Sequence, residues 1–135
     1  MANALFDKGR EGFLAGDIDW EADVIKAVLI DTADYTVNLA AHQFLSDIPL
    51  AARVATSEAL TGKTVANGVA DADDLTFAAV NGDSVEGLVL YQDTGVEGTS
   101  RLITYIDTAT GLPVTPNGGN INVFWDDGAN KIFKL

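Results

Sequence analysis

The chain has 135 residues, a usual size for one domain, and its 47% hydrophobic and 21% charged content indicates a folded protein rather than a disordered one. It carries 20 acidic and 8 basic residues, a formal net charge of −12, and no cysteine. This balance excludes nucleic acid and anionic membranes as partners, because both bind clustered Lys and Arg. The lack of cysteine excludes disulfides and thiolate zinc sites. We expect a single domain over residues 1–135 without a cofactor.

The N-terminal stretch 1–20 is predicted to be a short helix or arm, followed by a β core over residues 21–135. A helix is expected from Asn3, as the cap, to Leu14, ending at Gly16. Charged residues in its first turns exclude a secretory signal peptide. Four apolar side chains are expected to share one face of the helix: Leu5, Phe6, Phe13 and Leu14.

Strand signals dominate the rest of the chain. Residues 23–31 are apolar on both alternations, which predicts a strand buried on both faces. A helical turn is expected over 44–49, and strands are expected within 51–60, 63–70, 75–80, 85–92 and 101–107. Residues 121–135 read as a terminal hairpin turning at Asp127-Gly128. The regular spacing predicts a mainly β fold, an antiparallel sandwich or barrel-like domain.

The segment "DTATGLPVTPNGGN", residues 107–120, joins two of these strands. Pro113 and Pro116 each fix a φ angle, and Gly118-Gly119 permits a reversal of the chain. We interpret the segment as a structural corner.

Residues suited to catalysis are sparse. A Ser-His-Asp triad would have to use His42, the single histidine, with Ser46 or Ser57, but no Gly-x-Ser-x-Gly elbow is present. Asp126 and Asp127 beside a tryptophan resemble a glycosidase carboxylate pair, although hairpin chemistry explains them better. The sequence therefore predicts that the protein is not an enzyme.

The densest acidic run is Asp71 to Asp74. Asp71, Asp73 and Asp74 could offer oxygen ligands to calcium, but the further ligands and the glycine of a calcium loop are missing. A solvated loop is the default interpretation, and metal binding at these carboxylates stays open.

The chain resembles, almost from end to end, a family of small proteins encoded in the virion-structure regions of tailed-bacteriophage genomes. The matching stretches are "ALFDKGREGFLAGDIDW", "AVLIDTADYTVNLA", "HQFLSDIP", "ARVATS", "GVADADD", "SRLITYIDTATGLPVTPNGG" and "WDDGANKIFKL". The resemblance implies a virion structural protein. A small acidic β domain of this kind is similar to head decoration, or cement, proteins. These bind the outer capsid surface near three-fold positions and clamp neighbouring shell subunits.

That resemblance implies the major capsid protein as partner, a homo-oligomer with a trimer favoured, and location on the capsid exterior after assembly in the bacterial cytoplasm. It transfers no catalytic residue. Two partner-binding surfaces are expected. The first is residues 2–20, with Phe6, Phe13 and Trp20 exposed. The second is the corner at 112–120, with Leu112, Pro113 and Pro116.

Two alternatives remain. A tail or baseplate component involved in host attachment would expose aromatic and amide side chains, for which Tyr91 and residues 117–120 are the only hints. A small glycan hydrolase would need paired carboxylates in a cleft, one of them with a raised pKa.

Overall fold

The computed structural model describes residues 3–135 and confirms a mainly β fold with antiparallel sheets and one short helix near the N-terminus. The helix, α1, spans Asp7–Ala15. Two 3-10 turns occupy Leu45–Asp47 and Leu50–Ala52. The strands are β1 (Ala4–Leu5), β2 (Ile25–Ile30), β3 (Arg53–Thr56), β4 (Thr64–Ala66), β5 (Val69–Asp71), β6 (Leu75–Phe77), β7 (Gly87–Gln92), β8 (Leu102–Ile106), β9 (Ile121–Val123) and β10 (Phe133–Lys134).

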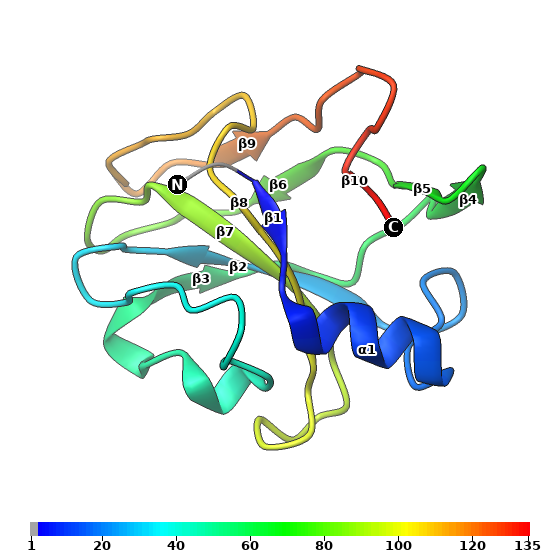
Figure 1. Ribbon diagram of the computed structural model, residues 1–135. Coiled ribbons are helices and arrows are strands. Elements are labelled where there is room, and N and C mark those ends of the chain that lie inside the picture. Colours follow the sequence, from blue (N-terminus) through cyan, green and yellow to red (C-terminus); the bar gives the residue numbers. More distant parts are fainter. Residues whose placement is uncertain (1–2) are drawn as a thin grey trace.

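A five-stranded antiparallel sheet in the order β1-β8-β7-β2-β3 forms the centre of the molecule (Figure 1). The six residues of β2 pair in continuous register with β7, from Ile25 opposite Gln92 to Ile30 opposite Gly87. Both faces of β2 are buried, as its two apolar alternations predict.

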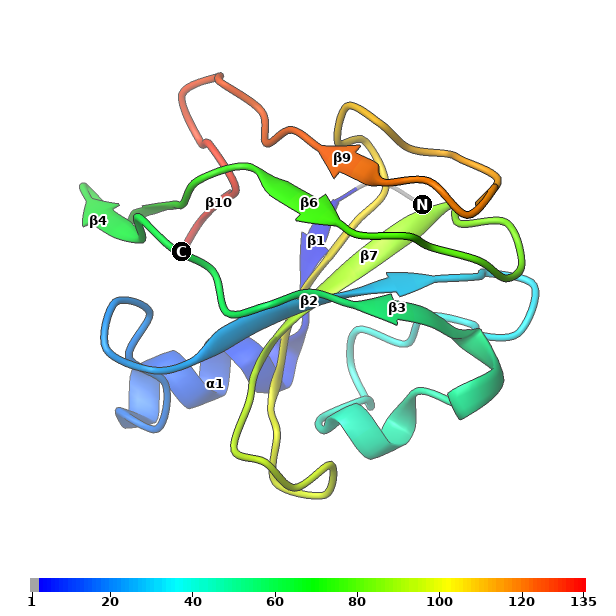
Figure 2. The ribbon, with the colours of Figure 1, turned by 180° about the vertical axis from the view of Figure 1, so that it is seen from behind.

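Different segments cover the two faces of this large sheet, which gives a sandwich-like arrangement. The three-stranded sheet β10-β5-β4 and the pair β6-β9 pack on one face, where Leu29, Leu90 and Trp125 share a core. The segment with the 3-10 turns covers the other face, where Val89 and Ile48 share a second core. Figure 2 shows β6 and β9 on one side of the large sheet and these turns on the other.

Strand β8 contributes side chains to both cores and contains a β-bulge. Tyr91 of β7 pairs with Leu102, whereas Leu90 pairs with Thr104, so Ile103 is an extra residue in the ladder. Leu102 faces the second core and its neighbour Ile103 faces the first, as alternation along a strand requires. Because of the bulge, Leu102 and Tyr105 both face the second core although they are three positions apart.

The N-terminal segment differs from its prediction. The helix begins at Asp7, and Asn3 is not its cap: the Asn3 carboxamide instead accepts hydrogen bonds from the backbone of residues 107 and 108. Leu5 lies in β1, and Leu14 is 84% exposed, so the expected four-residue face does not form. The predicted end is confirmed, because Gly16 caps the helix in the left-handed conformation.

Helix α1 lies directly on β8 because Gly9 has no side chain. A Cβ on Gly9 would stand 2.8 Å from the carbonyl oxygens of Leu102 and Ile103. The glycine that weakens the isolated helix therefore permits its close packing in the fold.

The predicted terminal hairpin is wrong. β9 pairs with β6, and β10 pairs with β5. The Trp125 backbone N–H donates to the Asp74 carboxylate and its indole N–H donates to the Asp73 carbonyl, so the chain is held away from a hairpin path. The Asp126 carboxylate accepts the Gly128 N–H in a local Asx turn.

Candidate interaction surfaces

The first expected partner surface does not exist in the form predicted. Phe6 is 0% exposed in the second core, and Trp20 is 4% exposed in the first. Phe13 is half-buried, with its ring 5.8 Å from that of Phe133. These aromatic residues hold the N-terminal segment on the domain, so the expectation that they are exposed is wrong.

Trp20 also connects the two ends of the chain. Its ring meets Phe133 of β10 edge to face at 5.3 Å, and its indole N–H donates to the Asp71 carbonyl of β5 at 3.1 Å. An edge-to-face aromatic pair and a satisfied indole N–H are typical of a core residue.

The second expected surface, the corner at 112–120, is on the outside of the molecule. Pro113 is exposed, while Leu112 and Pro116 are half-buried, and Leu112 packs against the first core. Backbone hydrogen bonds join Val114 to Val85 in both directions, at 2.8 and 2.9 Å. The segment 112–120 is therefore an ordered rim of the molecule, held by hydrogen bonds to the residue before β7, Val85.

Residues 117–120 of the same rim are also held by hydrogen bonds. Val80 donates to the Gly119 carbonyl and accepts from the Gly118 N–H, and the Asn117 carboxamide accepts the Gly119 N–H. The Asn120 carboxamide accepts the Ala79 N–H. These amides shape their own loop, and Tyr91 is 4% exposed, so the two hints of a host-binding tip have structural explanations.

Carboxylates gather beside this rim in a group that we call the acidic corner: Asp31, Asp34, Asp83 and Glu86. Oxygens of the three aspartates lie within 4.8 Å of one another. Asp31 is 4% exposed, and its carboxylate accepts a hydrogen bond from the Ala33 N–H just after β2.

Glu86 adds a further negative charge to this group. Burial alone would raise the pKa of its carboxyl, but hydrogen bonds from Ser84 and Thr32 outweigh that effect and lower it. The Thr32 N–H and hydroxyl both lie 2.9 Å from its Oε1. Glu86 is therefore ionised at neutral pH and adds a negative charge beside the three aspartates.

The aspartates of the 71–74 run, at the end of β5, do not gather into such a group of carboxylates. The Asp73 carboxylate accepts from the Thr61 hydroxyl, and the Asp74 carboxylate accepts the Trp125 N–H. Within residues 3–135, the carboxylates close enough to hold one cation are instead Asp31, Asp34 and Asp83. The sequence does not show this group, because the fold joins loops about fifty positions apart.

A hollow of about 310 Å³ adjoins the acidic corner and is lined by Tyr35, Tyr105 and Glu86 among others. Burial raises the pKa of both tyrosines, so both keep their phenolic protons. The Tyr35 hydroxyl lies 2.7 Å from His42 Nδ1, which also accepts the Asn38 N–H. His42 is committed to this contact, and Ser57 Oγ donates to the Glu58 carbonyl. Neither makes a triad contact with the other.

Comparison with known proteins gives no match to a protein-family model and none to a curated protein. In residues 3–135, no helix has the length and apolar character needed to cross a membrane.

Like charges in the acidic corner should lower stability. Asp83→Asn is expected to raise the free energy of unfolding by about 0.5 kcal/mol, because it removes one of the mutually repelling carboxylates. Urea denaturation in low salt measures the change. The gain should fall at about 1 M salt, where charges are screened within ~3 Å. Asp127→Asn makes the same charge change outside this group, and an equal gain there would contradict the explanation.

Proposed function

We propose that this chain is a bacteriophage virion structural protein, specifically a head decoration protein that binds the outer capsid surface and stabilises contacts between capsomers. The sequence resemblance supports the proposal, as does the small, acidic, mainly β domain. A trimer at or near three-fold positions is the expected assembly, and the major capsid protein is the expected partner.

The acidic corner beside the 112–120 rim is the observation that carries this proposal furthest. It joins an ordered, exposed backbone edge to a local excess of negative charge. Such a surface fits a positively charged patch on a shell protein, and repeated copies on a lattice would gain avidity from modest individual contacts.

A binding assay with expanded heads that lack the decoration layer tests the proposal. Purified protein is mixed with heads of the phage that encodes it, and the fraction that sediments with them is measured. We expect saturable binding with one trimer per three-fold site, weakened by the double substitution Asp34→Asn and Asp83→Asn. The double substitution Asp126→Asn and Asp127→Asn is the charge-matched control.

Two results would overturn the proposal at different levels. No sedimentation with heads would contradict the decoration function itself. If both double substitutions weakened binding equally, the protein would still be a head-binding protein, but the acidic corner would not be the surface that contacts the head.

A further inference from the structure

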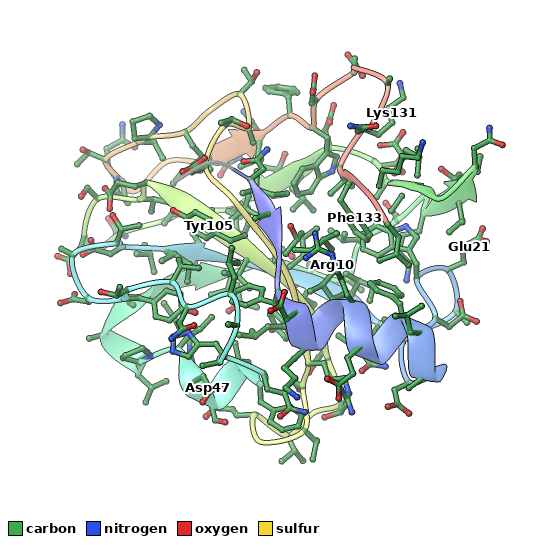
Figure 3. The ribbon with its side chains drawn as sticks, viewed as in Figure 1. Arg10, Glu21, Asp47, Tyr105, Lys131 and Phe133 are labelled. Atoms are coloured by element: carbon green, nitrogen blue, oxygen red, sulfur yellow. The ribbon has the colours of Figure 1, made fainter. Side chains whose placement is uncertain are left out.

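A cleft of about 300 Å³ separates two strand edges that belong to different sheets. β1 forms one wall, through Ala4 and Leu5, and β10 forms the other, through Phe133 and Lys134. β1 is an end strand of the large sheet, and β10 is an end strand of the three-stranded sheet. Figure 3 shows the Arg10 side chain rising from α1 between these two strands, with Phe133 on the β10 side.

In the part of the chain that the structure describes, each wall of the cleft has a backbone N–H and C=O that point away from the neighbouring strand. The Phe6 N–H donates to the Ile103 carbonyl, and Ala4 pairs with Tyr105 two positions earlier. Because backbone groups alternate in direction along a strand, the N–H and C=O of Leu5 point away from β8.

The same argument applies to β10. The Leu135 N–H donates to the Gly68 carbonyl, and Phe133 pairs with Ala70. The N–H and C=O of Lys134 therefore point away from β5. Each wall thus offers a donor and an acceptor that an added strand could pair with, as exposed sheet edges do in strand addition.

The rim of the cleft is positive in an otherwise acidic protein. Arg10, Lys131 and Lys134 line it, with Asp126 as the only carboxylate among its lining residues. Lys131 donates to a backbone carbonyl, and the ion pair of Arg10 within residues 3–135 is with the exposed Asp7, at 3.5 Å. Among residues 3–135, Lys134 forms no ion pair.

The other arginines and several lysines are compensated. Lys26 pairs with Asp93, Arg53 with Glu97, and Arg101 with Asp17, while Lys8 pairs with Glu11. The cleft is therefore a place where three basic side chains without strong ion pairs lie beside two strand edges.

We propose that this cleft binds an extended acidic segment of a partner protein, which adds as a strand between β1 and β10. The charge of the rim selects an acidic segment, and the two free edges select an extended one. The inference goes beyond the capsid proposal and does not depend on it.

Titration of the ¹⁵N-labelled protein with the peptide acetyl-Glu-Val-Glu-Val-Glu-amide tests this inference by NMR. We expect saturable shifts of the Leu5 and Lys134 amides. Lys134→Gln should weaken binding about threefold, the size typical of one exposed charge pair. Lys8→Gln is the matched control, since Lys8 does not line the cleft.

Two further peptides separate strand addition from simple charge attraction. N-methylation of both valines keeps the charge but removes backbone donors, and acetyl-Lys-Val-Lys-Val-Lys-amide reverses the charge. Strand addition predicts that both bind at least tenfold more weakly. Equal binding of either peptide, or no shift at Leu5 and Lys134, would overturn the proposal. Shifts at those amides on concentrating the protein alone would also overturn it, in favour of a second copy.

Discussion

Replacement of Trp20 by alanine is expected to lower the free energy of unfolding by about 3–5 kcal/mol, the usual cost of removing a large buried aromatic side chain. The ring is 4% exposed, contacts Phe133 edge to face, and donates to the Asp71 carbonyl. The substitution leaves a cavity and removes the hydrogen bond to β5. Urea denaturation followed by far-UV circular dichroism measures the loss.

Leu14→Ala is the control for Trp20→Ala. Leu14 also lies in the N-terminal segment and is apolar, but it is 84% exposed, so its truncation should change stability by less than about 0.5 kcal/mol. If Trp20→Ala were as mild as Leu14→Ala, Trp20 would not belong to the core, and its assignment to a partner surface would return.

Replacement of Gly9 by alanine should destabilise the protein by about 2 kcal/mol or more. In an isolated helix this change is favourable by about 1 kcal/mol. In the fold, the new Cβ would meet the carbonyl oxygens of Leu102 and Ile103 at 2.8 Å, and these are backbone atoms of a central sheet that cannot move aside cheaply. Denaturant unfolding of the variant measures the difference.

Gly98→Ala provides the comparison for Gly9→Ala. Apart from its two chain neighbours, no described residue has an atom within 4 Å of a Cβ built on Gly98, so this change should be neutral or slightly stabilising. A Gly9→Ala protein at least as stable as the wild type would show that α1 does not pack on β8 as described.

The buried strands could be predicted from sequence because their signal is local. The two apolar alternations of residues 23–31 correspond to β2, which is buried on both faces. The short turn ending near Pro49 was also predictable, because proline restricts the backbone around it. The end of α1 at Gly16 has the same local basis.

The errors arose where distant contacts overrule local patterns. Asp127-Gly128 is typical of a hairpin turn, but β9 and β10 each pair with a different strand earlier in the chain. Apolar residues near the N-terminus fit one helix face, yet Leu5 joins a sheet and Phe6 enters the second core. No local pattern in the sequence shows which strand edge is available for pairing.

The candidate surfaces also differ in whether they depend on local sequence or on contacts between distant segments. The proline-glycine corner was predictable because those residues act on their own backbone. The acidic corner was not, because it needs the exit of β2 and the loop before β7 to meet. The cleft between β1 and β10 likewise joins the two ends of the chain.

We propose that the protein decorates the phage head. Electron microscopy of intact virions labelled with a gold-conjugated antibody against this chain tests it most directly. A decoration protein should give label over the whole head surface and none on the tail. Label confined to the tail or baseplate, or virions without label, would contradict it.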